Sequence, residues 1–250
     1  MDKKLKAVVL AAGKGTRLQT EGAEMPKVMR EALGKPLLSY VLEGLGFIEK
    51  EDIIIVVGYK KEKVTAAFEG YMFAVQREQL GTGHAAMSAK NALSGYDGAV
   101  LVCCGDMPLI KRDTYEALVR THFEEGNACT MLTGTTAEKL PYGRVIRTPD
   151  GGFDRIVEER DCTPSEAEID ELNSGVYVFD AKKLLPALSE LKNNNSQGEY
   201  YLTDVPYVMQ AHGEKIGICK RDLGYEIIGV NTQSQLDQVE RLLREEKEEN

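Results

Sequence analysis

The sequence predicts an α/β fold in which helices cover both faces of a mostly parallel sheet and a smaller β region is added to it. Short, almost purely apolar runs alternate with segments of helical periodicity over the first half of the chain. Parallel strands are buried on both faces and need such continuous apolar runs, and the helices between them provide the crossovers. After residue 140, closely spaced glycine turns indicate the shorter strands of the added region.

The strands of the main sheet are predicted from five apolar runs. The first, Ala7–Leu10, follows a lysine-rich start that superficially resembles a signal peptide. Its apolar stretch is too short for one, and far shorter than the roughly 20 apolar residues of a membrane span, so we interpret it as a buried strand. The later strands are Ile53–Val57, Met72–Val75, Ala99–Cys104 and Cys129–Leu132.

Apolar residues at helical spacing indicate helices between these strands. One apolar stripe begins just after Pro36, a residue that suits the first turn of a helix. Asp113 and Glu116 have the spacing of a capping box, which predicts the start of the helix that carries Leu118 and Val119. The residues of the first stripe are Leu38, Val41, Leu42 and Leu45.

Turn signals mark the chain after residue 140. Glycine-containing turns at 142–144, 150–152 and 173–175 separate short strands such as Val176–Phe179. We expect this added region to close over the carboxyl edge of the main sheet.

The end of the chain has the pattern of an amphipathic helix followed by charged residues. We therefore predict one domain over residues 1–232 and a C-terminal amphipathic helix with a charged tail over residues 233–250. The apolar face of that helix consists of Leu236, Val239, Leu242 and Leu243.

The charge balance limits the partners of the chain. Lys and Arg number 31 against 40 Asp and Glu, a net charge of −9, with a pI near 5.1. Nucleic acids and anionic membranes need a basic face, so neither is expected as a partner. The five cysteines form no C-x-x-C and predict reduced thiols in the cytoplasm, and the three histidines lack the spacing of a zinc site.

The loop after the first strand is the first motif that could carry chemistry. Its small residues would let backbone N–H groups approach phosphate oxygens, and Lys14 and Arg17 add positive charge. An ordinary glycine turn is the alternative. The loop is neither a P-loop nor a dinucleotide fingerprint, because Leu18 occupies the place of the third glycine.

Three further positions invite a functional interpretation, each with a structural alternative. Lys27 follows Pro26 and can point back at the same phosphates, or it is a surface lysine. The glycine-rich segment 79–85 after Gln76 suits the edge of a base or an anion, or it is a plain strand-to-helix turn. Asp106 follows a buried strand, where a carboxylate can hold Mg²⁺ or stabilise a turn.

Together these motifs resemble the sugar nucleotidyltransferase family. Residues 10–17 with Pro26–Lys27 are similar to its signature, and more distant motifs narrow the resemblance to uridylyltransferases acting on N-acetylglucosamine-1-phosphate. The resemblance spans residues 5–232 and implies a Rossmann-like fold of the nucleotide-diphospho-sugar transferase type. The narrowing motifs are residues 79–85, 105–109, 142–144, 156–158, 173–175 and 193–204.

The resemblance implies a role for each matching residue. It places the nucleotide against Leu10, Ala11, Ala12 and Gly13, with Gln76 and Gly81 at the uracil edge. It makes Arg17 and Lys27 the catalytic residues that neutralise the triphosphate and the sugar phosphate, and assigns Mg²⁺ to Asp106 and Asn231. It brings Thr82, Cys104, Gly143, Glu158 and Asn173 to the sugar.

The implied reaction forms UDP-N-acetylglucosamine and pyrophosphate from UTP and N-acetylglucosamine-1-phosphate. A sugar-phosphate oxygen attacks the α-phosphorus in line with Mg²⁺ present, as a cytoplasmic step toward peptidoglycan precursors. One alternative is uridylyl or thymidylyl transfer to another sugar-1-phosphate, such as glucose-1-phosphate. Another is a nucleotide-sugar-binding module without catalysis.

Departures from the family pattern bear on these alternatives. Cys104 stands where the family usually has Tyr beside the acetamido group of the sugar, which motivates the first alternative. The loop between Arg17 and Pro26 is slightly longer than usual. The 250 residues contain no hexapeptide repeats of a left-handed β-helix, so no acetyltransferase activity is expected of them, and the resemblance allows a homo-oligomer.

Overall fold

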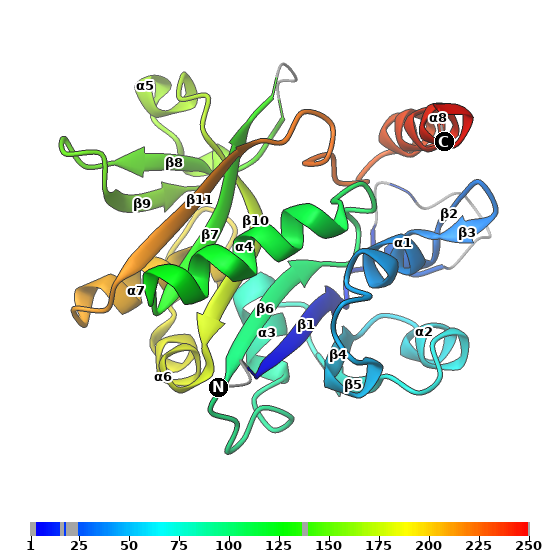
Figure 1. The fold of residues 1–250 in the computed structure, drawn as a ribbon, viewed down its shortest axis with the longest axis horizontal. Helices are drawn as coiled ribbons and strands as arrows, with labels where there is room; N and C mark the ends of the chain where they lie inside the picture. The colour runs from blue at the N-terminus through cyan, green and yellow to red at the C-terminus, as the bar shows by residue number, and fades with distance from the viewer. Residues whose placement is uncertain (1–3, 16–17, 19–24, 137–139, 250) are drawn as a thin grey trace.

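The chain folds around one twisted, mostly parallel sheet (Figure 1). The computed structural model describes residues 4–15, 18, 25–136 and 140–249. Along the sheet the strands follow the order β11, β7, β10, β6, β1, β4 and β5. Their bounds are β1 Leu5–Ala11, β4 Ile53–Val57, β5 Met72–Val75, β6 Ala99–Cys104, β7 Cys129–Thr135, β10 Leu172–Asp180 and β11 Ile216–Asp222.

Strand β10 is the exception to the parallel arrangement. It lies between β6 and β7 and pairs antiparallel with both, whereas β1 pairs parallel with β4 and β6. The five predicted strands of the main sheet are confirmed, but the expectation that Val176–Phe179 belongs to the added region was wrong. These residues are fully buried in β10, because a central strand is covered by helices on both faces.

Helices cover both faces of the sheet, as predicted. Strand β1 shows the division: Ala7, Val9 and Ala11 pack toward one face, while Val8 and Leu10 pack toward the other. The first face is covered by α1 (Leu37–Gly44), α2 (Lys61–Ala67) and α4 (Arg112–Glu125). The second is covered by α3 (Thr82–Ser88), α6 (Ala181–Glu190) and α7 (Val205–Ala211).

Helix α4 begins earlier than its sequence pattern predicted. Its N-cap is Lys111, with no side-chain capping bond, and Glu116 pairs with Arg112 at 2.7 Å. The capping box expected at Asp113 and Glu116 is therefore wrong. Asp113 lies in the first turn instead, where its negative charge interacts favourably with the helix dipole.

The last helix, α8 (Gln233–Glu249), packs against the rest of the chain. Leu236, Val239 and Leu243 are buried in a cluster with residues from the β2–β3 hairpin (Glu31–Ala32 and Lys35–Pro36) and α1. The Leu33 amide also donates a 2.9 Å hydrogen bond to the Glu240 carboxylate. The predicted apolar face of this helix thus has a defined partner.

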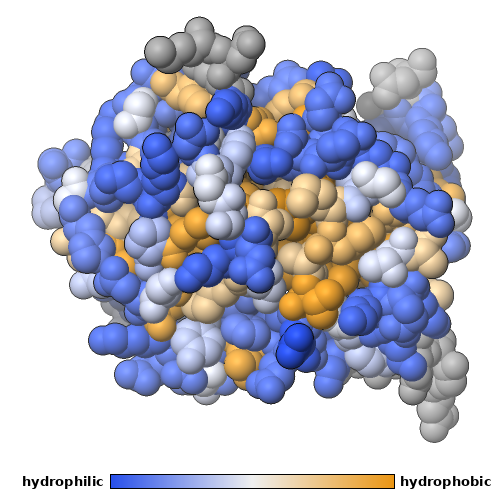
Figure 2. Space-filling model, turned by 90° about the horizontal axis from the view of Figure 1, so that it is seen from below, coloured by the Kyte–Doolittle hydropathy of each residue, from blue (hydrophilic) through white to orange (hydrophobic). Residues whose placement is uncertain are grey.

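The described surface is predominantly polar. Figure 2 shows the lower face of the Figure 1 view, where hydrophobic residues gather near the middle and hydrophilic ones border them. Large hydrophobic side chains exposed on the described chain are Met72, Val75, Leu80 and Tyr207. Within that part of the chain, no helix combines the length and the apolar character needed to cross a bilayer.

The added β region is a two-stranded extension of β10. Strand β8 (Arg144–Arg147) pairs antiparallel with β9 (Phe153–Val157) and joins the sheet where Arg144 faces Leu172. Because β10 runs against its neighbours, its first residues lie at the edge where the parallel strands end. The extension is therefore attached at the carboxyl edge of the main sheet, as expected.

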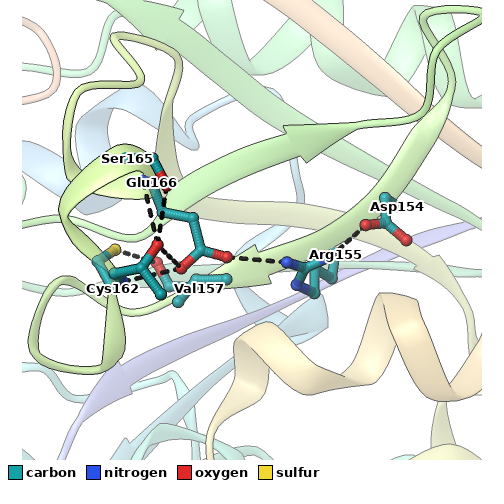
Figure 3. A network of polar contacts seen from close by, with 7 residues as sticks. Asp154, Arg155, Val157, Cys162, Ser165 and Glu166 are labelled. Carbon is teal, nitrogen blue, oxygen red and sulfur yellow. Dashed lines mark hydrogen bonds and ion pairs between the residues drawn. The ribbon is translucent and has the colours of Figure 1, made fainter.

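A polar network stabilises the segment that follows β9 (Figure 3). Thr163 and Glu166 form a capping box at the start of α5 (Pro164–Ala167). Arg155, which also pairs with Asp154, donates a 2.8 Å hydrogen bond to the Glu166 carboxylate, and the Cys162 thiol contacts the Val157 carbonyl oxygen at 3.6 Å. These contacts tie the turn after Glu158 to the strand before it.

Candidate active site

Polar and glycine residues converge at the carboxyl edge of the sheet because several strands end there. Gly13 follows β1, Gln76 follows β5, and Asp106 follows β6. Asn173 joins them from the other chain direction, since β10 is antiparallel and begins at this edge. Ligands of open α/β sheets bind at such an edge.

Two adjoining cavities open here. The glycine-loop cavity, of about 260 Å³, lies beside the loop after β1. The β10 cavity, of about 190 Å³, lies between β10, the β8–β9 extension and the segment around Asn231. Thr82, Cys104 and Asp106 line both and form their common wall.

The structure brings nearly all the predicted site residues to these cavities. Those lining the glycine-loop cavity alone are Leu10, Ala11, Ala12, Gly13, Lys27, Gln76 and Gly81. Those lining the β10 cavity alone are Gly143, Glu158, Asn173 and Asn231. Arg17, the remaining predicted residue, lies outside the described residues. The residues assigned by resemblance to the nucleotide and to the sugar thus separate into two compartments.

A cluster of Lys27, Asp106 and Asn231 lies where the compartments meet. The Lys27 ammonium forms an ion pair with the Asp106 carboxylate and donates a 2.7 Å hydrogen bond to Asn231 Oδ1. A backbone bond of 2.9 Å from the Val230 amide to the Asp106 carbonyl oxygen holds the two loops together. The side chains of Lys27 and Asp106 are each 16% exposed, so their charges interact with little screening by water.

The oxygen atoms of Asp106 and Asn231 suit a hard divalent cation. Both side chains converge on the same ammonium nitrogen, so a single positive centre can contact both. Mg²⁺ typically takes one or two protein oxygen ligands and completes its shell with water and substrate phosphates. In the described part of the chain, no cluster of three or more His, Cys, Asp or Glu side chains forms an all-protein metal cage. The residues present therefore fit a metal shared with a phosphate ligand.

The glycine loop approaches Lys27 closely because Gly15 has no side chain. Gly15 has a φ of +63°, and a Cβ there would lie 2.7 Å from Lys27 Cβ. A Cβ at Gly13 would meet nothing within 4 Å, so that backbone faces open space in the glycine-loop cavity. A larger residue at 15 would displace Lys27, whereas one at 13 would reduce the room for a ligand.

Gln76 is held in place at the far side of this cavity. It is 4% exposed, and its Nε2 lies 3.1 Å from the Gly81 carbonyl oxygen, to which it donates, and 3.2 Å from His84 Nδ1. Gly81 has a φ of +104°, and a Cβ there would come within 2.6 Å of the Tyr200 carbonyl oxygen. A glycine is therefore required at 81 by the packing of the chain itself.

The segment 199–203 forms part of both cavities through backbone pairing with residues 80–83. The Tyr200 amide donates to Leu80 O at 2.9 Å, the Gly83 amide to Tyr200 O at 2.8 Å, and the Leu202 amide to Thr82 Oγ1 at 3.1 Å. This pairing brings Glu199 to the glycine-loop cavity and Thr203 to the β10 cavity.

Glu158 and Cys104 are among the ionisable groups of the β10 cavity that have perturbed pKa values. Burial raises the pKa of Glu158, and a 2.9 Å hydrogen bond from Thr203 Oγ1 opposes that shift. Burial, with the nearby Asp106 charge, raises the pKa of Cys104 to about 12. The Cys104 thiol therefore stays protonated at neutral pH and is a poor nucleophile.

Several lining residues escaped the sequence prediction. The Tyr142 hydroxyl accepts a 2.7 Å hydrogen bond from the Gly229 amide and so ties the β8 side of the cavity to the segment before Asn231. Tyr142, Glu199 and Thr203 lie within motifs already noticed, at 142–144 and 193–204, but were assigned no role, and nothing in the sequence marked Tyr177 as a site residue. Their places depend on pairings between distant segments.

Comparison with known proteins agrees with this geometry. A family model described as Nucleotidyl transferase matches residues 6–229. The chain is 43% identical over 240 residues to the Bifunctional protein GlmU of Clostridium novyi (strain NT), covering 95% of this chain and 52% of that protein. It is 42% identical over 241 residues to the same-named protein of Pelotomaculum thermopropionicum, covering 96% and 52%. The chain thus spans about half the length of these relatives.

A solved structure supports the fold. A Bacillus anthracis chain described as a glucose-1-phosphate thymidylyltransferase, solved with sucrose, aligns with a TM-score of 0.73 over 96% of both chains at 19% identity. At that identity the likeness concerns the fold alone. The family match covers most of the sequence, and the chain belongs to the nucleotidyl transferase family.

Proposed function

We propose that this chain transfers the uridylyl group of UTP to N-acetylglucosamine-1-phosphate and releases pyrophosphate. The observation that carries the proposal is the pair of adjoining cavities with Lys27 and Asp106 at their junction. One compartment contains the residues that the sequence resemblance assigns to a nucleotide, and the other contains those it assigns to a sugar.

The glycine-loop cavity suits the nucleotide. The backbone at Gly13 is open to a ligand, and small residues along the loop let phosphate oxygens approach N–H groups. The amide of Gln76 is positioned by its bonds to Gly81 and His84, so it can present hydrogen-bonding groups to a base edge without losing side-chain entropy on binding.

The main obstacle to the reaction is the repulsion between two polyanions. Two unit charges 4 Å apart repel by roughly 4 kcal/mol at an effective dielectric constant of 20, and these substrates carry several charges each. An ammonium group has three N–H donors, so Lys27 can bridge Asp106, Asn231 and a phosphate oxygen. Asp106 and Asn231 would hold a divalent cation, which supplies further neutralisation of the phosphates when bound.

Once the charges are neutralised, holding the two substrates in the correct orientation is enough for uridylyl transfer. An oxygen of the sugar phosphate attacks the α-phosphorus of UTP from the β10 cavity, a new P–O bond forms, and the bond to the β-phosphate breaks as pyrophosphate leaves. No protein nucleophile takes part, which is consistent with a protonated thiol at Cys104. Holding both reactants in line accounts for the rate by removing the entropic cost of their encounter.

The test is a pyrophosphate-release assay of UTP, dTTP and CTP against a panel of sugar-1-phosphates, with and without Mg²⁺. We expect the highest kcat/KM for UTP with N-acetylglucosamine-1-phosphate, and loss of activity with a chelator. A higher kcat/KM with glucose-1-phosphate or with dTTP would contradict the proposed substrates and identify those of the alternative reaction. Binding of UTP without pyrophosphate release from any pair would identify a non-catalytic module.

A further inference from the structure

The segment 229–232 carries Asn231 and has no regular secondary structure. Each of its four backbone amides nevertheless donates a hydrogen bond. The Asp106 carbonyl oxygen accepts the bond of the second amide, and the side chains of Tyr142 and Gln235 accept the other three. The conformation of the segment therefore depends on two side chains that lie outside it.

Gln235 holds the second half of the segment from the first turn of α8. Its Oε1 accepts a 2.8 Å hydrogen bond from the Asn231 amide and a 3.1 Å bond from the Thr232 amide. The Gln235 amide donates in return to Thr232 Oγ1 at 3.3 Å. This reciprocal pair with Thr232 is a capping box, which stabilises the start of the helix. The shorter bond, to the Asn231 amide, lies outside the box and fixes the residue that we assign to the cation.

Helix α8 gives Gln235 a fixed place. Leu236, the next residue, is buried against the chain. Near the end of the helix, Glu246 accepts a 2.8 Å hydrogen bond from the Tyr225 hydroxyl and pairs with Lys111 at 3.2 Å. Contacts along the helix thus determine where the Gln235 side chain begins.

Tyr142 holds the other end of the segment from the β8 side. Its hydroxyl oxygen accepts the 2.7 Å bond from the Gly229 amide, and its ring packs against the buried core. A Cβ at Gly229 would lie 2.8 Å from that oxygen. The glycine therefore allows the close approach of amide and hydroxyl, and the segment is held at both ends.

The position of this segment bears directly on the proposed cation site. Asn231 Oδ1 and the Asp106 carboxylate meet at the Lys27 ammonium. Mg²⁺ accepts only near-octahedral geometry, so its two protein oxygens must have the correct separation. If the amides of the segment lost their acceptors, Asn231 would have to be ordered each time a cation binds, and that ordering would lower the affinity.

We propose that Gln235 and Tyr142 are positioning residues that hold Asn231 Oδ1 beside the Asp106 carboxylate before a cation binds. Gln235 lines neither cavity, so it acts through the backbone of Asn231 and not on a substrate. This inference rests on the cation site of the proposed function and extends it to the residues that set the affinity of that site.

The test measures cation binding directly. Mn²⁺ prefers the same oxygen ligands as Mg²⁺, and electron paramagnetic resonance reports the free ion in a titration of the chain without substrates. Gln235→Ala should raise the Mn²⁺ dissociation constant about fivefold or more. The Mg²⁺ concentration for half-maximal pyrophosphate release should rise by a similar factor, and saturating Mg²⁺ should restore the rate to within about twofold of the wild type.

Two further variants separate the hydrogen bond from other effects. Gln235→Glu keeps an oxygen acceptor for both amides, so its Mn²⁺ dissociation constant should stay at most about twofold above that of the wild type. Gln233→Ala is the matched control, because Gln233 lies in the same turn, is exposed, and donates to Asp237 at 2.7 Å. It should bind Mn²⁺ as the wild type does.

A purely structural role gives a different result. It would lower the folded fraction, and hence the rate, at every Mg²⁺ concentration and leave the Mn²⁺ dissociation constant of Gln235→Ala unchanged, which would overturn the inference. Mn²⁺ binding by Gln235→Glu as weak as that by Gln235→Ala would also overturn it. If Gln235→Ala does not fold, Tyr142→Phe replaces it, since it removes only the hydroxyl acceptor. An unchanged Mn²⁺ dissociation constant in that variant would contradict the inference.

The two proposals fail separately. If the wild-type chain releases no pyrophosphate, the proposed function fails, and the Mn²⁺ titrations still test the positioning role. If it releases pyrophosphate while Gln235→Ala keeps the wild-type Mn²⁺ and Mg²⁺ curves, only the positioning role fails. A wild-type chain that binds no Mn²⁺ would also overturn the positioning role, because there would be no preformed site to hold.

Discussion

The Lys27 ammonium donates a 2.7 Å hydrogen bond to the amide oxygen of Asn231 across 204 positions of sequence. The same ammonium pairs with Asp106, so residues from three distant segments meet at one positive charge. This junction lies between the two cavities, and the function of each member can be tested separately.

Lys27→Ala removes the positive charge at the junction. We expect kcat/KM for pyrophosphate release to fall by about 10²-fold or more, the range seen when one donor to a negative charge that develops in a transition state is lost. The variant should still fold, which circular dichroism checks, although the Asp106 carboxylate loses its ion-pair partner. Lys35→Ala is the control, because Lys35 pairs with Glu43 and lines neither cavity. Near-normal activity of Lys27→Ala would contradict its assigned role.

Asn231→Ala removes one of the two oxygen ligands proposed for the cation. The Mg²⁺ concentration for half-maximal activity should rise by at least about tenfold, while saturating Mg²⁺ restores part of the rate. A Mg²⁺ titration of the initial rate measures the shift. The exposed Asn91→Ala substitution should leave the titration unchanged. An unshifted Asn231→Ala curve would exclude this residue from the metal site.

Gly13→Ala adds one methyl group to the open space of the glycine-loop cavity. Because nothing lies within 4 Å of that position, the unfolding free energy should stay the same while KM for UTP rises several-fold. Gly81→Ala should instead lower the unfolding free energy, because its Cβ would clash with the Tyr200 carbonyl oxygen. Urea unfolding measures the stability of both variants, and a UTP titration of the initial rate measures KM. An unchanged KM in Gly13→Ala would contradict close approach of the nucleotide to the backbone at Gly13.

Arg147→Ala should destabilise the chain by about 2 kcal/mol, because it leaves the Glu171 carboxylate buried with fewer partners. Arg147 contacts Glu171 at 2.6 and 3.1 Å, and Thr133 donates to the same carboxylate at 2.6 Å. Burial would raise the pKa of Glu171, but these donors hold it below its ordinary value. The double variant Arg147→Ala/Glu171→Gln should recover part of the loss in urea unfolding. Additive losses would show that the two residues do not interact.

His122 should make the stability of the chain depend on pH. Burial lowers its pKa from 6.5 to about 4, and a nearby Asp180 partly opposes this. The unfolded chain therefore takes up a proton below pH 6.5 while the folded chain does not, so stability is lost as the pH falls toward 4. Between pH 7 and pH 5 the loss from this group is about 2 kcal/mol.

A His122→Gln variant isolates that contribution. Its unfolding free energy should decrease less than that of the wild type between pH 7 and pH 5, by roughly the same 2 kcal/mol. Equal pH dependence in the two proteins would show that His122 does not titrate differently on folding.

The sequence by itself determined the parallel core and the residues that follow it. Continuous apolar runs such as Ile53–Val57 suit a strand covered on both faces, and this local property survives in any arrangement of the strands. It also placed Gly13 and Asp106 directly after strands, so their convergence at one sheet edge could be expected. Helix boundaries were less secure, as the start of α4 shows, because several polar residues near Asp113 can serve as a first turn.

The tertiary structure alone decided the order and direction of the strands. The insertion of β10 between β6 and β7 depends on pairing across long stretches of sequence, which no local pattern records. That insertion carries Asn173 and Tyr177 to the site, and the path after β11 carries Asn231 to Lys27. Hydrogen bonds between such distant residues form only when the whole sheet has assembled, and this is why the wall of the β10 cavity had no complete signature in the sequence.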